Sequence, residues 1–257
     1  MNKLHSKIDI SVVIASFNES KVLPISLLNL FSFLDNLQEN FEIIVSDDGS
    51  TDETKFLNWC FYYDKFNVRY IRSSVNTGKG GALRRGLQVS SGKYVLFTDA
   101  DIPVELDAIY KVIELLKKGE FDIVIGNRYL PDSEIIGSSS FMRRFLSKVF
   151  NIVVRIMVLP QYSDTQCCLK GFSLEALKAI LPFCSVNSYA VDVELLKIAE
   201  LQKMRIGAIP VKWKDSRISF GLLKIIRFGI ILLKDIICIS ITRIISRPFE
   251  INLKSNI

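Results

Sequence analysis

Two carboxylates at the end of a buried strand are the residues of this sequence best suited to chemistry. The apolar run from Tyr94 to Thr98 predicts a strand covered on both faces of a mainly parallel sheet. Asp99 and Asp101 follow it, separated by the small Ala100. An extended chain that leaves a sheet edge can direct both carboxylates at one hard cation, and open α/β sheets bind ligands at that edge. The pattern therefore predicts a cation site, with an ordinary acidic turn as the alternative.

A second acidic pair and a glycine-rich turn are expected at the same rim. The run from Phe41 to Val45 predicts another buried strand, and Asp47 and Asp48 follow it. Lys79 lies in the turn Gly78–Gly81, which opens a helix and is expected to offer backbone N–H groups to a phosphate. Crowded carboxylates repel unless a cation neutralises them, and a divalent ion with open positions suits phosphate oxygens. We therefore expect a nucleoside diphosphate.

The elements that position these residues alternate along the chain. Strands are predicted at residues 9–16, 41–45, 67–72, 94–98, 121–126, 164–172 and 206–213. Helices are predicted at residues 24–37, 106–117, 141–159, 174–181, 191–202 and 221–245, with a further one opened by the glycine-rich turn. Ser50 or Thr51 is expected to cap a helix after the second strand. This order predicts an α/β fold with a doubly wound, mainly parallel sheet and right-handed crossovers.

Two of the predicted helices are amphipathic, and they suggest how the chain meets a membrane. Residues 141–159 and 221–245 each pair an apolar face with Lys or Arg. Neither has the ~20 uninterrupted apolar residues that a spanning helix needs, so both are expected to lie in the membrane interface; helices that cover a core are the alternative. We expect a catalytic domain over residues 1–215 and a membrane-surface helix and tail over residues 216–257.

The composition narrows the function classes. The 257 residues carry a net charge of +6, 49% of them are hydrophobic, and the mean hydropathy is +0.28, which favours an anionic membrane surface over nucleic acid. A zinc site is disfavoured because His5 is the only histidine and the five cysteines form no C-x-x-C pair. The glycine-rich turn lacks the P-loop and dinucleotide-fold spacings, which disfavours ATP hydrolysis and hydride transfer. No apolar leader precedes the first strand, so we expect the cytoplasmic face of a membrane.

A spaced set of motifs resembles glycosyltransferase family 2 and, within it, the dolichyl-phosphate β-glucosyltransferase branch. The segments that carry the resemblance are SVVIASFNE, IIVSDDGSTDET, NTGKGGALRRG, YVLFTDAD, GNRY, DTQCCLKGF and YAVDVELL. The resemblance implies a nucleotide-sugar fold of the glycosyltransferase A type, a divalent metal (Mg²⁺ or Mn²⁺), a sugar nucleotide donor and a polyprenyl phosphate acceptor. It also implies inversion at the anomeric carbon.

The resemblance gives roles to individual positions. Nucleotide-sugar contacts are expected at Ala15, Phe17, Glu19, Asp47, Asp48, Lys79 and Ala100. Catalytic roles are expected at Asp99, Asp101, Arg128 and Asp164, of which Asp99 and Asp101 hold the metal. An anionic lipid headgroup would arrive at the start of the first amphipathic helix, so contacts with the acceptor phosphate are expected at Arg143 and Arg144. The resemblance places Lys170 at the end of the acceptor-side segment that begins at Asp164, and a contact with the acceptor phosphate is expected there too. Lys170 could instead be a solvated surface charge.

The expected reaction is transfer of one hexose, glucose from UDP-glucose, to a polyprenyl phosphate. A phosphate monoester has a second pKa of ~6 and is already a nucleophile at neutral pH, so the scarcity of histidine is no obstacle. Mannose from GDP-mannose, a soluble transferase acting on a glycan or protein hydroxyl, and a silent nucleotide-sugar-binding scaffold are the alternatives. The sequence leaves the sugar, the prenyl length and the oligomeric state open. Asp192 and Glu194 lie two apart on a predicted helix and so cannot share a face, which makes at least one of them structural.

Overall fold

The computed structural model describes residues 7–57, 67–137, 141–214 and 222–241. Of residues 141–146 and 222–228 it describes the helical backbone but not the side chains. The predicted boundary between residues 215 and 216 therefore lies outside the described residues.

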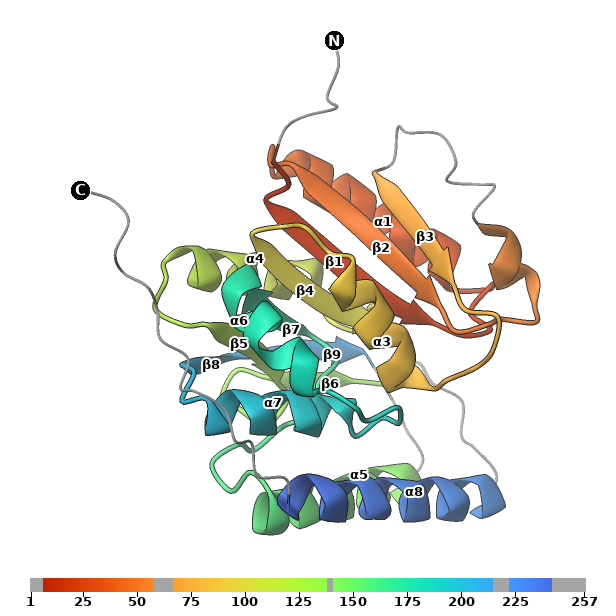
Figure 1. The fold of residues 1–257 in the computed structure, drawn as a ribbon, viewed down its shortest axis with the longest axis vertical. Coiled ribbons are helices and arrows are strands. Elements are labelled where there is room, and N and C mark those ends of the chain that lie inside the picture. The colour runs from red at the N-terminus through yellow and green to blue at the C-terminus, as the bar shows by residue number, and fades with distance from the viewer. Residues whose placement is uncertain (1–6, 58–66, 138–140, 215–221, 242–257) are drawn as a thin grey trace.

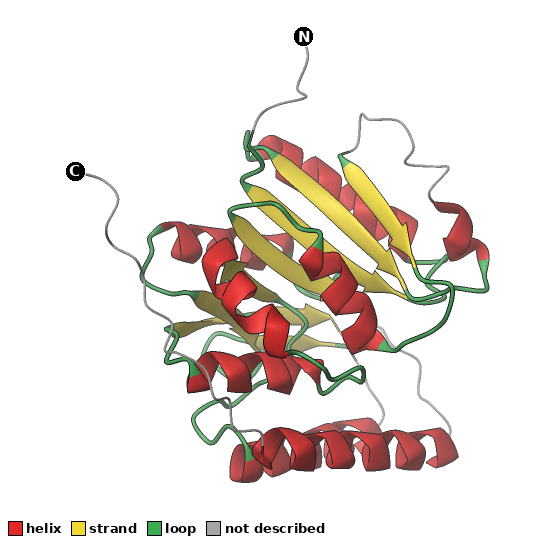
Figure 2. Ribbon diagram, viewed as in Figure 1, coloured by secondary structure: helices red, strands yellow, loops and turns green. Residues whose placement is uncertain are grey.

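A seven-stranded sheet forms the centre of the protein, in the order β3-β2-β1-β4-β7-β5-β8 (Figure 2). Every neighbouring pair is parallel except those made by β7, which runs antiparallel to β4 and β5. The strands are β1 (Ile10–Ser16), β2 (Phe41–Asp47), β3 (Val68–Arg72), β4 (Tyr94–Asp99), β5 (Ile123–Asn127), β7 (Lys170–Ser173) and β8 (Ile206–Pro210). A small parallel sheet pairs β6 (Glu134–Ile136) with β9 (Lys212–Lys214). The predicted mainly parallel α/β fold is confirmed.

Helices cover both faces of the central sheet (Figure 1). One face carries α1 (Leu23–Asn36) and α4 (Leu106–Lys117). The other carries α3 (Lys79–Gln88), α6 (Leu174–Ile180) and α7 (Val191–Leu201). The 3-10 helices are η1 (Glu53–Phe56) and η3 (Leu181–Phe183). Because both faces are covered, adjacent residues of a central strand enter different cores: Val12 and Ile14 pack on the α1 side and Val13 on the α3 side.

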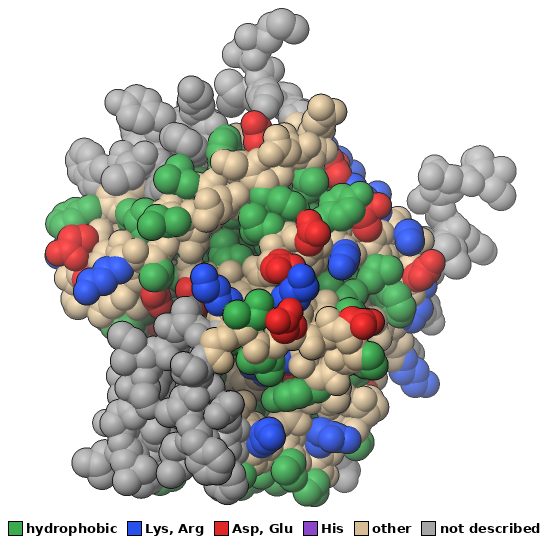
Figure 3. Space-filling model, turned by 180° about the vertical axis from the view of Figure 1, so that it is seen from behind, with side chains coloured by type: hydrophobic (Ala, Val, Ile, Leu, Met, Phe, Trp, Pro, Cys, Tyr) green, Lys and Arg blue, Asp and Glu red, His purple; other side chains and the backbone are tan. Residues whose placement is uncertain are grey.

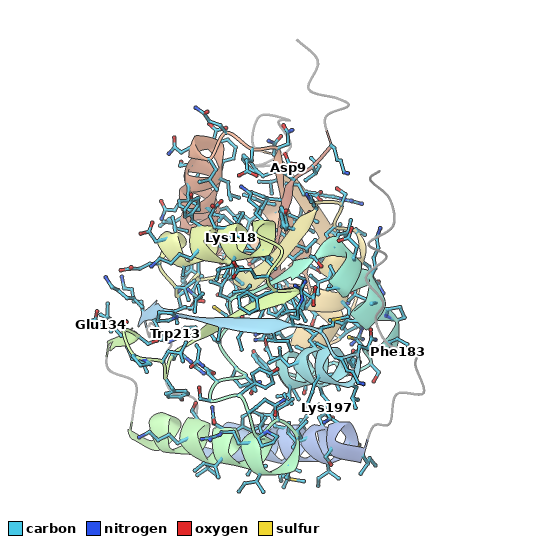
Figure 4. The ribbon with its side chains drawn as sticks, turned by 90° about the vertical axis from the view of Figure 1, so that its left-hand side faces the viewer. Asp9, Lys118, Glu134, Phe183, Lys197 and Trp213 are labelled. Atoms are coloured by element: carbon cyan, nitrogen blue, oxygen red, sulfur yellow. The ribbon has the colours of Figure 1, made fainter. Side chains whose placement is uncertain are left out.

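Two long helices form an outer layer beyond α7. They are α5 (Phe141–Met157) and α8 (Leu222–Ile241), which pack against each other, and α8 also contacts α7 (Figure 1). Lys197 of α7, labelled in Figure 4, lies above this layer and donates from Nζ to the carbonyl oxygen of Val158 at 3.4 Å. Among the described helices, none combines the length and the apolar character needed to cross a bilayer.

Charges are mixed over the back of the molecule. Figure 3 shows acidic and basic side chains interspersed among hydrophobic ones on the described part of that face. Attraction for a large polyanion is therefore not concentrated there.

The predicted strand at residues 164–172 was too long. The sheet pairing begins at Lys170, and the preceding residues form a loop that ends at the sheet edge. Asp164 explains the loop, because its carboxylate accepts the backbone N–H of Gln166 and binds Arg128. A local pattern of apolar residues does not contain that long-range pairing.

Two other local predictions were also wrong. The predicted strand at residues 206–213 is divided at Val211: β8 continues the main sheet and β9 joins the small one. Pro210 has no N–H and ends the first ladder. Among the described residues between β2 and β3, the helix that follows β2 is the short η1, and its cap is Asp52 and not Ser50 or Thr51.

Replacing Gly171 with valine is expected to destabilise the fold. A Cβ at this position of β7 would lie 2.3 Å from Val112 Cγ1 and 3.0 Å from Leu116 Cδ1, both on α4. Overpacking of this kind should lower the free energy of unfolding by ~1–3 kcal/mol, measured by urea denaturation. Gly119→Asn is the control, since no atom lies within 4 Å of its Cβ position and Asn tolerates the φ of +72°. Equal stability of Gly171→Val and the wild type would contradict this packing.

Candidate active site

The carboxyl edge of the parallel strands gathers the candidate residues. In the sheet register Ala15 lies opposite Asp99, and Ser16 lies opposite Asp47. Because β7 is antiparallel, its first residue, Lys170, lies at this edge too, opposite Phe97 of β4. Donor-side and acceptor-side segments therefore meet at one edge.

A chain of alternating charges crosses this edge toward the interior. Lys79 Nζ lies 3.0 Å from Asp99 Oδ1 and 3.4 Å from Asp192 Oδ2. Asp192 in turn accepts from Lys170 Nζ at 2.5 Å through its other oxygen. Asp192 and Lys170 are buried, whereas Lys79 and Asp99 keep 13% and 14% of their side chains exposed. This series of alternating charges thus runs from the buried ammonium of Lys170 to the carboxylate of Asp99, which is within reach of solvent.

The burial of Lys170 excludes the alternative that it is a solvated surface charge. Its ammonium is 1% exposed and donates to the carbonyl oxygen of Cys167 at 2.7 Å as well as to Asp192. Lys170 is therefore not a solvated surface charge, and the acceptor-phosphate contact expected there stays a prediction. Arg143 and Arg144 belong to the first turn of α5, where the structure describes no side chains, so their predicted contacts lie outside the described residues.

Arg128, which is partly exposed, pairs with the buried Asp164. The guanidinium donates from Nε and Nη2 to the two oxygens of Asp164 at 2.8 and 2.9 Å, and the backbone N–H of Arg128 donates to it at 2.9 Å. Trp213 covers the guanidinium, with its ring centre 4.9 Å from Cζ; Figure 4 shows this residue on β9. Asp164 therefore holds Arg128 in place, and the catalytic role expected at Asp164 stays a prediction.

Electrostatics follow from this pairing. Burial alone would raise the pKa of Asp164, but the hydrogen bonds and charge of Arg128 outweigh it and leave that pKa below its ordinary value. Burial would lower the pKa of Arg128, and Asp164 raises it by more. Both groups are therefore ionised at neutral pH.

The carboxylate of Asp48 binds the glycine-rich turn. It accepts the backbone N–H groups of Thr77 and Gly78, at 3.0 and 2.7 Å, and Arg85 Nη2 at 2.7 Å. The backbone N–H of Gly80 donates to Asn187. Asp48 is 2% exposed and engaged with protein groups, and the N–H groups of Thr77, Gly78 and Gly80 serve protein acceptors; the nucleotide contact expected at Asp48 stays a prediction.

Asp47 is also an interior residue. It is fully buried and accepts from the Ser50 amide and hydroxyl, from Tyr70 at 2.5 Å and from Arg72 Nε at 3.1 Å. Burial and the neighbouring Asp47 carboxylate raise the pKa of Tyr70. In this arrangement Asp47 orders the loop after β2, and the nucleotide-sugar contact expected at Asp47 stays a prediction.

The loop after β1 supplies the other predicted nucleotide contacts. Phe17 is 43% exposed, and Ala15 and Glu19 are partly buried. Asn18, at a φ of +57°, accepts the Thr51 amide at 2.8 Å and so ties this loop to the one after β2. Ala100 is buried and can offer a ligand only its backbone.

Sequence reasoning assigned no site role to three residues of this edge. Asp192 bridges the two lysines, Tyr189 places its ring 5.6 Å from Lys79 Nζ, and Trp213 covers Arg128. Asp192 lies in the segment YAVDVELL, in which nothing local distinguishes it from Glu194. Glu194 accepts the amides of Ser185 and Val186 and is structural, so the expectation that at least one of this pair is structural is confirmed.

The donor set at Asp99 and Asp101 fits a divalent cation. Within the described residues, no group of three or more His, Cys, Asp or Glu side chains could hold a metal on its own. Two carboxylates suit an ion that completes its coordination with substrate oxygens and water. Asp99 already accepts a cationic group, the ammonium of Lys79. Asp99 and Asp101 are the residues that would hold the ion.

Comparison with known proteins identifies the family. The sequence matches the family described as glycosyl transferase family 2 over residues 11–181. The chain belongs to that family. It is similar to the dolichyl-phosphate beta-glucosyltransferase of Dictyostelium discoideum, with 34% identity over 80% of this chain and 66% of that one. It is also similar to the Homo sapiens protein of the same name, with 35% identity over 80% and 67%. The chain spans about two thirds of the length of these relatives.

A solved structure supports the fold. Glucosyl-3-phosphoglycerate synthase from Mycobacterium tuberculosis, crystallised with Mn²⁺, UDP-glucose and phosphoglyceric acid, matches with a TM-score of 0.67. The match covers 91% of this chain and 80% of that one at 20% identity. At this identity the likeness concerns the fold alone, and it agrees with the predicted glycosyltransferase A type.

Acid unfolding should reveal the role of Asp48. Burial raises its pKa, but the hydrogen bonds from Arg85, Thr77 and Gly78 outweigh burial and leave the pKa below 3.8. A carboxyl whose pKa is depressed on folding stabilises the protein above the unfolded-state pKa, and that stability is lost as pH falls through the folded value. Asp48→Asn should therefore be less stable at pH 7, by about 1–3 kcal/mol, and lose less stability on acidification below pH 4.

Urea denaturation at several pH values between 3 and 7 measures this difference. Asp132→Asn, in an exposed turn, is the control and should keep wild-type stability at neutral pH. Parallel curves for Asp48→Asn and the wild type would show that the carboxylate does not stabilise the turn.

Proposed function

We propose that this protein transfers glucose from UDP-glucose to a polyprenyl phosphate of the dolichyl type, with inversion, at the cytoplasmic face of a membrane. The observation that carries the proposal is the match to relatives named dolichyl-phosphate beta-glucosyltransferase, at 33–35% identity over 80–81% of this chain. The D-x-D pair at the sheet edge supplies the corresponding chemistry.

Donor binding is assigned to the edge formed by β1, β4 and β5. Asp99 and Asp101 would hold Mg²⁺ or Mn²⁺, which when bound neutralises charge on the leaving nucleotide. Arg128 lies on the same edge at the end of β5, and its orientation is fixed by Asp164 and Trp213. Because the Arg128 guanidinium is fixed before the substrate arrives, it can stabilise developing negative charge without reorganisation. This makes Arg128 suited to contact the diphosphate. The loop that contains Phe17 follows β1 at this edge, and Phe17 is exposed there.

The acceptor needs no protein base in this proposal. A prenyl phosphate is largely a dianion at neutral pH and can attack the anomeric carbon itself. The protein's task is to bring two anions together, and Arg128 is suited to reduce their repulsion. A transferase for sugar hydroxyls would instead need one of the edge carboxylates as its base.

The outer layer of α5 and α8 is proposed as the membrane-facing surface. Several of its apolar side chains are exposed, among them Ile152, Ile156 at 78%, Ile237 and Ile241 at 73%. Lys148 and Arg155 are exposed on α5, and Lys234 on α8. Inward-facing residues such as Val154 and Ile236 are buried, so the exposed apolar residues are surplus to the core. This combination favours insertion into an anionic bilayer surface.

Transfer assays test the proposed reaction. Purified protein, vesicles with polyprenyl phosphate and Mn²⁺ are incubated separately with UDP-glucose and GDP-mannose, and the lipid product is identified by mass spectrometry. Glucosyl lipid is expected, and Asp101→Asn should reduce its formation roughly 100-fold or more. Asp107→Asn, exposed at the start of α4, is the matched control. The same assay is repeated with the prenyl alcohol in place of the prenyl phosphate. Formation of mannosyl lipid alone, or equal transfer rates to the alcohol and the phosphate, would overturn the proposal.

Vesicle sedimentation tests the membrane surface. Ile156→Asp with Ile241→Asp should weaken binding to vesicles that contain anionic lipid, because two carboxylates would enter the apolar boundary. Ile25→Asp is the matched control, since Ile25 is 64% exposed but lies on α1. If the outer-layer variant and the control lost vesicle binding equally, or if neither lost it, the exposed residues of the outer layer would not form the membrane-binding surface.

A further inference from the structure

The charge chain at the sheet edge contains two groups that the proposed reaction does not use. Asp192 and Lys170 are both 1% exposed and face each other across 2.5 Å. A buried ammonium needs an anion and hydrogen-bond acceptors, and Lys170 finds them in Asp192 and the carbonyl oxygen of Cys167. Asp192 also lies in the first turn of α7, where the helix dipole favours a carboxylate. Its position is therefore fixed from two sides.

Lys79 is held against Asp192 by the backbone around it. Gly78 and Gly80 approach the loop before α7 so closely that a Cβ on either would lie 2.4 Å or less from the carbonyl oxygen of Asn187 or Val186. The backbone N–H of Gly80 donates to Asn187 at 2.9 Å, and Arg84 donates to Val186. The starts of α3 and α7 are thus fastened together, and Lys79 is shared by two carboxylates with little freedom to leave.

The sharing of Lys79 between Asp99 and Asp192 matters because Asp99 is also assigned to the divalent cation. The Lys79 ammonium lies 3.0 Å from the Asp99 oxygen, so a metal at that oxygen must compete with it or draw it away. Asp192 offers the ammonium a second carboxylate at 3.4 Å. The stronger the hold of Asp192 on Lys79, the lower the cost of freeing Asp99 for a cation.

We propose that Asp192, fixed by Lys170, is a positioning residue that controls the divalent-cation affinity of Asp99 by drawing Lys79 away from it. This inference rests on the proposed function for the metal site. Lys79 then remains tethered beside the site, with its charge available to the donor's phosphates once the cation has replaced it at Asp99.

Mn²⁺ binding without nucleotide tests the idea, read from the electron paramagnetic resonance signal of the free ion. Four proteins form a double-mutant cycle: wild type, Lys79→Met, Lys170→Met with Asp192→Asn, and all three changes together. Removing Lys170 and Asp192 as a pair leaves no buried charge without a partner. Glu200→Gln, which removes the Lys197 ion pair at 3.0 Å elsewhere on α7, is the control.

Lys79→Met and the pair variant are expected to shift the affinity for Mn²⁺ in opposite directions. Lys79→Met should bind Mn²⁺ about 3- to 10-fold more tightly than the wild type, because the competitor is gone. The Lys170 and Asp192 pair variant should bind it more weakly by a similar factor. In the Lys79→Met background the pair change should alter affinity by less than about twofold, since Asp192 acts through Lys79. Glu200→Gln should match the wild type.

Unchanged or weaker Mn²⁺ binding in Lys79→Met would overturn the inference. The inference would also be overturned if the pair change altered Mn²⁺ affinity equally with and without Lys79. That result would indicate that the pair acts on the cation directly through its electric field, or through a general structural change. Circular dichroism and thermal melting of every variant identify misfolding, and Lys79→Met, which leaves the buried pair of Lys170 and Asp192 intact, keeps the inference testable if the pair variant fails to fold. Failure of glucosyl transfer in the wild type with an intact cycle would overturn the proposed function and leave this inference standing.

Discussion

The active edge of this protein depends on the burial of one positive charge. The Lys170 ammonium is enclosed between the sheet and α7, with Phe97 at 5.4 Å, and an enclosed ammonium without an anion would be strongly unfavourable. Asp192 must therefore lie where it does, which fixes the start of α7 against the sheet. Lys79 and Asp99 extend the same chain to the rim. Alternating charges let a polar site be built over an apolar core without an unpaired ion.

Much of the edge consists of polar groups that serve other protein groups. Asp47, Asp48 and Asp164 are buried and bind the loops, the glycine-rich turn and Arg128. In the described residues the carboxylates assigned to the cation are Asp99 and Asp101, which are partly exposed. Most acidic residues here thus orient the few that can reach a ligand, as expected where a site requires preorganisation.

Sequence predicted the parts of the fold that local pattern determines. Strands buried on both faces must be continuously apolar, so β1, β2 and β4 were found within a residue or two. The D-x-D pair was placed at the sheet edge for the same reason. What failed was set by distant partners: the start of β7 depends on Asp164 meeting Arg128, and the burial of Lys170 depends on Asp192, 22 residues away. No window around Lys170 contains that information.

The glycine-rich turn has a consequence for ligand recognition. The amides of Thr77 and Gly78 are occupied by the carboxylate of Asp48 and that of Gly80 by the carbonyl oxygen of Asn187, so the protein supplies its own internal anion at a turn where other nucleotide-binding proteins admit a phosphate. These three amides are therefore not offered to a diphosphate, whose recognition at this edge would depend more on side-chain and metal charges. Under the proposed function, the affinity of this edge for the donor would then depend on the divalent cation that accompanies the diphosphate, because the cation supplies part of the positive charge that these amides do not.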